Sequence, residues 1–229
     1  MRIGNLEVPG MLALAPMAGV TDLAFRTVCA GLGADMTVTE MVSSRALVYQ
    51  DQKSRGLLKK NEGSICGAQI FGNDPAIMAE AAVLAAEISG CDFIDINMGC
   101  PMPKIANNGD GCGLMKVPEL AGDIVKAVSD KLSIPVTVKC RLGWDKGSIN
   151  VLDFTKRMED NGAAMVTVHG RTRGMLYSGA GQWRYYQRRI SGEVLEAYRC
   201  RRHYDRQSHL WRSLDLRGGQ GCAGRKTHT

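Results

Sequence analysis

The chain has 229 residues, of which 45% are hydrophobic and 23% charged, and these values predict one globular domain with a substantial core. Its apolar stretches stay far below the roughly 20 residues that cross a bilayer, and the N-terminus lacks the apolar segment and cleavage site of a signal peptide. The sequence thus excludes a membrane partner, and we expect a cytoplasmic protein whose eight cysteines stay reduced.

The net charge of +6 arises entirely at the C-terminal end of the chain. Residues 184–229 contain 11 Lys and Arg against 4 Asp and Glu, whereas residues 1–183 contain 18 against 19. A basic protein often binds an acidic partner such as nucleic acid. Here, however, the asymmetry separates a basic tail from a nearly neutral body.

From residue 11 to about residue 170, short apolar runs alternate with longer helical patterns. The apolar runs predict six strands, at Met11–Ala15, Met36–Met41, Cys66–Phe71, Phe93–Asn97, Pro135–Lys139 and Met165–His169. Capping residues, first-turn prolines and a terminal glycine predict four helices, at Asp22–Leu32, Pro75–Ser89, Pro118–Leu132 and Ile149–Asn161. This β-α repeat predicts an α/β fold with a parallel sheet.

Two architectures share such a repeat, an open doubly wound sheet and a (β/α)₈ barrel. The first strand-to-helix turn, APMAGVTD, lacks the GxGxxG pattern of dinucleotide-binding sheets. Polar residues follow nearly every strand, as they do in barrels whose active sites lie at the carboxyl ends of the strands. We therefore predict a TIM (β/α)₈-type barrel that is incomplete, with about six βα units.

The first candidate site residues follow the first and third strands. Pro16, Met17 and Ala18 lie in the segment APMAG, whose small residues and proline let the backbone approach a flat ligand; an ordinary tight turn is the alternative. Gln69 offers both a donor and an acceptor to the edge of a heterocycle, and a satisfied polar residue near the barrel mouth is the alternative.

The fourth strand ends in the motif DINMGCPMPK, which contains Asn97 and Cys100. Cys100 lies three residues after Asn97 on a turn framed by glycine and proline. A thiol presented at the catalytic face of a barrel can donate a proton in a site shielded from water, although a structural thiol is the plainer alternative. The Gly/Asn-rich loop that continues to about Lys116 is typical of a lid or substrate loop.

Basic residues follow the fifth and sixth strands. Lys139 and Arg141 end the fifth strand, and His169 opens the motif HGRTR after the sixth. A lysine at the barrel mouth can place positive charge against an electron-rich ring, while the histidine and arginines suit phosphate or an anionic ring. Surface ion pairing is the alternative for each, but all of these groups converge on one face.

In order and spacing, six segments of the chain resemble the bacterial tRNA-dihydrouridine synthases. They are APMAGVTDLAFR, QIFGNDP, DINMGCPMPK, NNGDGCGLMK, VTVKCRLGWD and VTVHGRTRGMLYSG. The resemblance covers residue 3 to about residue 183. It implies a flavin-dependent oxidoreductase with an FMN-binding barrel and a smaller C-terminal helical domain.

The resemblance also implies an FMN site, a uridine site and a proton donor. The residues implied to bind FMN are Pro16, Met17, Ala18, Gln69, Lys139 and His169, with Gln69 and Lys139 at the pyrimidine edge. Asn97 and Arg141 would bind the target uracil, and Cys100 would be the catalytic proton donor. NADPH or NADH would reduce FMN, hydride would pass to uridine C6, and Cys100 would protonate C5. The partner would be tRNA, and the enzyme a monomer.

After Trp183 the family's pattern stops. Residues 184–229 lack the expected IPVIGNGDI-like strand and the following Gly-Arg pair. We expect residues 1–183 to form the barrel through its sixth strand, with two unpaired sheet edges, and the helical domain to be absent. We also expect weak or absent FMN binding, which would reduce or abolish activity, because strands seven and eight commonly supply the phosphate site.

The tail itself allows several interpretations. A reading-frame shift or gene fragment would produce a disordered tail. Its arginines with interleaved Tyr and Trp could instead form an RNA-binding arm. A zinc site is a further alternative, from Cys200, His203, His209, Cys222 and His228, although their spacing matches no standard pattern.

Two other functions compete with tRNA-dihydrouridine synthase. One is another FMN barrel oxidoreductase of the dihydroorotate or dihydropyrimidine dehydrogenase type, which is not expected to carry the DINMGCPMPK and VHGRTR segments together. The other is a non-catalytic RNA-binding remnant that retains affinity for tRNA through its basic tail.

Overall fold

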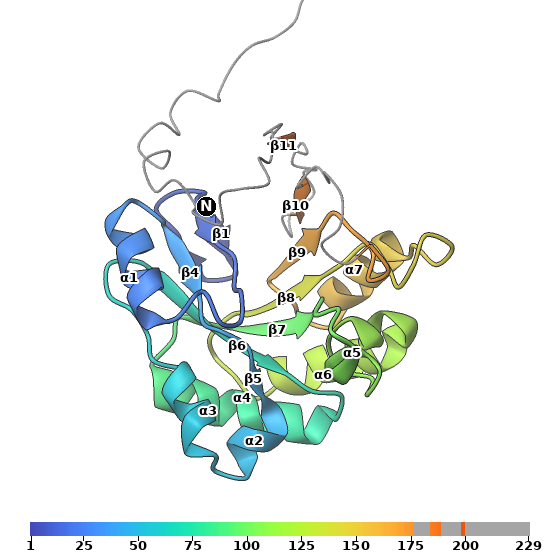
Figure 1. Ribbon diagram of the computed structural model, residues 1–229, viewed down its shortest axis with the longest axis horizontal. Coiled ribbons are helices and arrows are strands. Elements are labelled where there is room, and N and C mark those ends of the chain that lie inside the picture. The colour runs from blue at the N-terminus through green and yellow to red at the C-terminus, as the bar shows by residue number, and fades with distance from the viewer. Residues whose placement is uncertain (176–183, 189–197, 200–229) are drawn as a thin grey trace, which may run out of the picture.

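The computed structural model describes residues 1–175, 184–188 and 198–199 (Figure 1). The predicted zinc site, and most of the sequence interpreted as an RNA-binding arm or a disordered tail, lie outside these residues. The segment from Tyr177 to Trp183 at the end of the family resemblance lies outside them as well.

A curled parallel sheet forms the centre of the molecule (Figure 1). Its strands, in spatial order, are β3 (Ala13–Leu14), β4 (Met36–Val38), β6 (Ile65–Phe71), β7 (Phe93–Met98), β8 (Val136–Cys140) and β9 (Met165–His169). All six predicted strands are confirmed, although the first two are shorter than expected. The order follows the chain and the helices lie around the outside of the curl. The fold is therefore an incomplete (β/α)₈-type barrel and not an open doubly wound sheet.

Three short strands supplement the parallel sheet. β5 (Val42–Ser43) pairs in parallel with the end of β6. β10 (Arg184–Arg188) pairs antiparallel with β9, and β11 (Tyr198–Arg199) pairs antiparallel with β10. The expected unpaired edge at the sixth parallel strand is therefore wrong. The antiparallel direction of β10 also distinguishes it from the seventh strand of a barrel, which would run parallel.

A short hairpin covers the amino ends of the strands. β1 (Arg2–Ile3) pairs antiparallel with β2 (Leu6–Glu7). Ile3 and Val8 are buried against the first residues of three strands, namely Met36, Phe93 and Met165. This apolar cluster forms a floor inside the curl, so the polar site must lie nearer the carboxyl ends.

The long helices begin at the capping residues that the sequence predicts. α1 (Leu23–Gly31) is capped by Asp22, whose carboxylate accepts from the Phe25 N–H at 2.8 Å. α4 (Pro75–Ser89) is capped by Asp74 and ends at Gly90, whose φ is 60°. The other two predicted helices are α6 (Pro118–Ser129) and α7 (Val151–Asp160).

The sequence did not predict the shorter helices. They are α2 (Ser44–Val48), α3 (Gln52–Leu57), α5 (Pro103–Ala106) and the 3₁₀ helix η1 (Gly111–Lys116). Each has six residues or fewer, which is too short for a helical period to stand out. α5 and η1 lie within the long loop after β7 and give it a defined shape.

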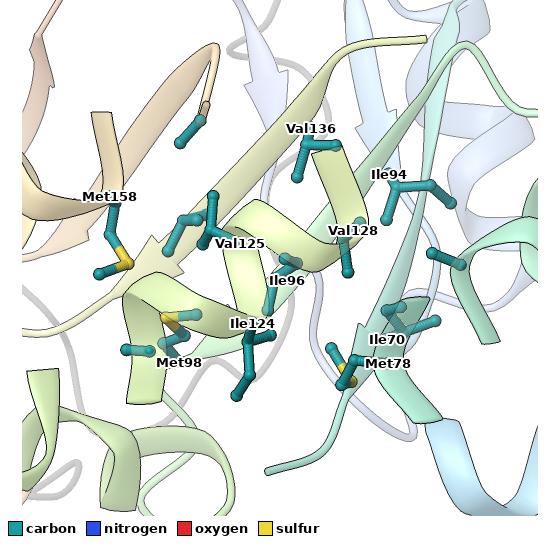
Figure 2. Packing of buried hydrophobic residues seen from close by; sticks show 14 of the residues in the cluster. Ile70, Met78, Ile94, Ile96, Met98, Ile124, Val125, Val128, Val136 and Met158 are labelled. Carbon is teal, nitrogen blue, oxygen red and sulfur yellow. The ribbon is translucent and has the colours of Figure 1, made fainter. Parts of the chain in front are cut away.

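The main hydrophobic core lies between the outer face of the sheet and the helices (Figure 2). Ile94 and Ile96 of β7 and Val136 of β8 point from the sheet toward Ile124 and Val128 of α6. Burying one such side chain contributes about 1.5–3 kcal/mol, so this layer stabilises the packing of α6 against the sheet.

The strand β7 presents different chemistry to the two sides of the sheet. Ile94, Ile96 and Met98 belong to the outer core, so the alternating residues Phe93, Asp95 and Asn97 face the interior of the curl. Phe93 lies in the apolar floor, and the two polar residues lie above it.

Candidate functional site

Three side chains form a row across the interior of the sheet. Gln69 of β6 is in register with Asp95 of β7, which is in register with Thr137 of β8. The Gln69 Nε2 donates to Asp95 Oδ2 at 2.6 Å, and the Thr137 hydroxyl donates to Asp95 Oδ1 at 2.5 Å. All three are buried, so each carboxylate oxygen of Asp95 has a protein donor.

Asn97 connects this row to the turn that carries Cys100. Its Nδ2 donates to Gln69 Oε1 at 2.9 Å. Its Oδ1 accepts from the backbone N–H groups of Gly99, at 3.1 Å, and Cys100, at 2.9 Å. The structure therefore brings together three residues singled out in the sequence, Gln69, Asn97 and Cys100.

Arg141 secures the same turn from the other side. It is almost completely buried; its Nε donates to the Gly99 carbonyl at 2.8 Å and its Nη1 to the Thr172 carbonyl at 3.0 Å. This side chain joins the turn after β7 to the loop after β9. The surface ion-pair alternative considered for Arg141 is therefore wrong.

The Cys100 thiol is partly buried, and this environment governs its protonation. Burial raises its pKa above the ordinary value, while the Met102 backbone N–H and the charge of Arg141 act in the opposite direction. At neutral pH the group is therefore a thiol, and a thiolate formed there would have two stabilising neighbours.

Lys139 lies one layer above the Asp95 row, in register with Asn97. Burial lowers the pKa of Lys139, and the carboxylate of Asp95 opposes this effect. Burial likewise raises the pKa of Asp95, whereas its hydrogen bonds and Lys139 lower it. Burial thus disfavours the charged form of each group, and their mutual attraction opposes this effect.

His169 at the end of β9 is buried, and burial is the largest cause lowering its pKa to about 3. The positive charges of Arg141, Lys139 and Arg171 lower it further. His169 is therefore neutral at neutral pH. The basic character expected of the HGRTR motif therefore comes from its arginines, not from the imidazole.

The loop containing Pro16, Met17 and Ala18 lies at the carboxyl end of β3. The Met17 N–H donates to Thr21 Oγ1 at 2.9 Å, and the Gly19 N–H donates to the Glu40 carboxylate. Met17 and Ala18 are exposed, and Pro16 is partly buried. In the described part of the chain, no hydrogen bond joins this loop to Gln69 or Lys139. The structure thus places it at the same edge of the sheet but does not bring it into their network.

A basic and aromatic cluster lies on the loops beyond the site. The Lys116 Nζ is 4.4 Å from the centre of the Trp144 ring, and the Arg173 guanidinium carbon is 4.6 Å from it. Arg173 also donates to Asn107 Oδ1 at 3.4 Å. Two cations are therefore held beside one aromatic ring, on loops that follow β7, β8 and β9.

Comparisons with known proteins decide the family. A family model described as "Dihydrouridine synthase (Dus)" matches residues 13–188. The chain belongs to the dihydrouridine synthase family. One relative, "tRNA-dihydrouridine synthase B" of Vibrio vulnificus, is 41% identical over 184 residues, which cover 80% of this chain and 57% of the relative. The protein of the same description from Pseudomonas aeruginosa is 44% identical over 184 residues, covering 80% and 55%.

The chain thus spans little more than half the length of those two relatives. A third relative, "Probable tRNA-dihydrouridine synthase" of Rhizobium leguminosarum bv. phaseoli, is 41% identical over 228 residues. That match covers 97% of this chain and 72% of the relative, so it extends into the basic tail, which the other two matches largely leave out.

The sequence reasoning missed two residues of the site, Asp95 and Thr137. A signal for Asp95 was present, because it lies two residues before Asn97 and alternate residues of a strand share one face. Thr137 likewise lies two residues before Lys139 on β8, so these two side chains also share one face. Their pairing, however, depends on the register between β7 and β8.

Neither a metal centre nor a membrane segment is found in the described residues. Within residues 1–175 and the two short strands, no three His, Cys, Asp or Glu side chains form a group that could hold a metal ion. Over the same residues, no helix has the length and apolar character needed to cross a bilayer.

Proposed function

We propose that this chain carries the uridine-reducing centre of a tRNA-dihydrouridine synthase. The observation that carries the proposal is the hydrogen-bonded chain from Gln69 through Asn97 to the backbone of Cys100, at the carboxyl ends of the strands. It would join a flavin-binding amide to the backbone of the residue that carries the thiol. The reaction is reduction of the uridine C5–C6 double bond.

The residues present fit an FMN group. The Gln69 amide and the Lys139 ammonium come from the same interior face, and they would bind the carbonyl-bearing pyrimidine edge of a flavin. His169 would pack beside the ring as a neutral group. Thr172 Oγ1 is buried without a hydrogen-bond partner in the described residues, which leaves a polar atom for a ligand. FMN, when bound and reduced by NADPH or NADH, supplies the hydride.

The loop after β3 would complete the FMN site. Pro16, Met17 and Ala18 would line the flavin, in agreement with their place at the same edge of the sheet. Met17 is 42% exposed, so an apolar surface is open to a flat ring there.

Cys100 would hold the proton that uridine C5 receives. Burial keeps the thiol protonated at neutral pH by raising its pKa, and Asn97 holds the backbone beneath it. Arg141 and the Met102 N–H would stabilise the thiolate left after transfer. Asn97 and Arg141 would also orient the uracil ring.

tRNA is the proposed partner, acting as substrate of a monomeric cytoplasmic enzyme. The target uridine must leave its stack to reach an interior site, so contacts with the surrounding backbone are needed. Lys116 and Arg173 beside Trp144 offer phosphate contacts and an aromatic surface near the barrel mouth.

For domain organisation we propose a barrel at residues 1–183 followed by a basic tail at residues 184–229. The composition change at this boundary supports the division. We further propose a reading-frame shift near residue 190 as the origin of the tail. Resequencing the gene tests this, since the idea requires an intact downstream frame encoding a GNGDI-like segment, and finding none would refute it.

The decisive experiment for function is Cys100→Ala, with Cys29→Ala on α1 as a control. The full chain is incubated with tRNA transcript, NADPH and added FMN, and dihydrouridine is measured by mass spectrometry. FMN is added because residues 184–229 lack the strand motifs expected to supply the phosphate site. Loss of the proton donor should reduce turnover by about a hundredfold or more. The absorbance of protein-bound FMN should be the same in the variant as in the wild type. Wild-type turnover by Cys100→Ala would refute the assignment.

Two other outcomes would identify the competing functions. Reduction of a free pyrimidine base in preference to tRNA would favour a dihydroorotate or dihydropyrimidine dehydrogenase type of enzyme. Salt-dependent tRNA binding without any flavin absorbance would favour the non-catalytic RNA-binding remnant.

A further inference from the structure

An unbroken chain of side-chain hydrogen bonds runs across three strands to the backbone of Cys100. Thr137 donates to Asp95, Asp95 accepts from Gln69, and Gln69 accepts from Asn97. Asn97 in turn accepts from the Cys100 N–H. In the three hydrogen bonds between side chains, the partners are 26 to 42 residues apart in the sequence. Only the folded sheet can therefore create this connection.

The two ends of the chain have fixed polarity. A backbone N–H can only donate, so Asn97 must turn its oxygen toward Gly99 and Cys100. The Asp95 carboxyl group accepts from Thr137 on one oxygen and from Gln69 on the other, so Gln69 turns its nitrogen toward Asp95. Between these ends the two amides have one arrangement in which every contact pairs a donor with an acceptor. Turning over either amide would place nitrogen against nitrogen or oxygen against oxygen.

Asp95 supplies the only carboxyl group in this chain of hydrogen bonds. It is 4% exposed, and both oxygens are occupied at 2.5 and 2.6 Å. Without an acceptor at this position, the buried Nε2 of Gln69 would lose its partner, and nothing on that side would oppose rotation of the Gln69 amide. Rotation would present a donor to the Asn97 nitrogen and weaken the hold of Asn97 on the turn.

We propose that Asp95 is a positioning residue, which fixes the amide orientations of Gln69 and Asn97 and through them holds the Cys100 turn in place. The inference rests on the proposed function only in taking Cys100 as the proton donor. Asp95 itself would touch neither flavin nor uridine. Its effect reaches the site through the hydrogen bonds of its neighbours.

The test measures how fast iodoacetamide alkylates Cys100 in the full chain, by peptide mass spectrometry without flavin or tRNA. Asp95→Leu keeps the branching and the number of side-chain heavy atoms but removes the acceptor. We expect alkylation of Cys100 to become about three- to tenfold faster, the effect of weakening roughly one hydrogen bond. Thr37→Val is the control, because it removes a buried hydrogen bond to Asn61 elsewhere in the sheet, and it should leave the rate within about twofold of the wild type.

A double-mutant cycle separates positioning from a general loss of stability. Asn97→Ala removes the acceptor of the turn directly, so it should accelerate alkylation at least as much as Asp95→Leu. If Asp95 acts through Asn97, adding Asp95→Leu to Asn97→Ala should change the rate by less than about twofold. The proposal would be overturned if Asp95→Leu accelerated Cys100 alkylation equally in the wild type and in Asn97→Ala. It would also be overturned if Asp95→Leu alone left the alkylation rate at the wild-type value.

A charge-swapped variant provides the rescue. In Asp95→Asn combined with Gln69→Glu, the amide introduced on β7 can donate to the carboxylate introduced on β6, and that carboxylate can still accept from Asn97. This variant restores the order of donors and acceptors and keeps the same side-chain volumes and number of carboxyl groups. The rate of Cys100 alkylation should therefore return to within about twofold of the wild-type rate. A rate as fast as that of Asp95→Leu would overturn the proposal. Absence of flavin binding or dihydrouridine formation in the wild type would count against the proposed function alone, since alkylation needs neither.

Discussion

Acid should destabilise this protein through His169, and the size of the effect follows from its environment. The imidazole is buried beside Arg141, Lys139 and Arg171, and this burial and these charges lower its pKa to about 3 from an ordinary value of 6.5. The folded state therefore binds the proton more weakly than the unfolded state. The stability tied to neutral His169 is fully present above pH 6.5 and is lost as the pH falls toward 3.

The expected loss can be calculated for a moderate change of pH. Between pH 7.5 and 5, the difference between a folded pKa of about 3 and an unfolded value of 6.5 costs about 2 kcal/mol of unfolding free energy. Asp95 and Asp110 act in the opposite direction, because burial raises their pKa values. Their contribution grows as the pH falls, so the wild-type curve alone would understate the effect of His169.

The assay compares the wild type with His169→Gln by urea unfolding of the flavin-free chain across this pH range. Gln keeps a polar side chain but cannot be protonated. The wild type should lose about 2 kcal/mol more than the variant between pH 7.5 and 5, and the excess should disappear above pH 7. Parallel pH curves for the two proteins would refute the reasoning, because they would mean that His169 gains its proton equally well in both states.

Two further changes should alter stability through packing and capping. Gly67→Ala would place a Cβ 2.2 Å from Phe93 Cε2, so it should lower the unfolding free energy by about 1–3 kcal/mol; Gly31→Ala, where no atom lies within 4 Å, is its control, and equal effects would contradict the packing argument. Asp74→Ala removes the acceptor of the Ala76 and Ile77 N–H groups at the start of α4 and should cost about 1 kcal/mol, measured by urea unfolding. An unchanged midpoint would show that α4 does not depend on this cap.

Local sequence signals predicted most of the framework. Asp74 followed by Pro75 marked the start of α4, and Gly90 follows its last residue with a positive φ. The apolar runs of β6, β7, β8 and β9 were located to within one or two residues. These signals act over a few residues, so no knowledge of distant contacts was needed.

The limits of sequence reasoning show at β10 and in the loop after β7. The tail was not expected to pair with the parallel sheet, yet Arg184–Arg188 forms a strand against β9. Edge pairing uses backbone groups, so an apolar pattern is not required for it. The short helices α5 and η1 were missed because their residues are ordered by contacts with the turn of Cys100, such as the Cys112 N–H to the Cys100 carbonyl at 3.1 Å.

For the site, the sequence by itself determined most of the membership. It placed Gln69, Asn97, Cys100, Lys139, Arg141 and His169 at the ends of parallel strands, which must meet at one edge of the sheet. The tertiary structure alone decided their states. His169 is neutral because three cations and a buried environment surround it, and Asp95 joins the site because the register sets it between Gln69 and Thr137. Protonation and amide orientation depend on neighbours brought together across the sheet, and no local pattern of residues encodes those distances.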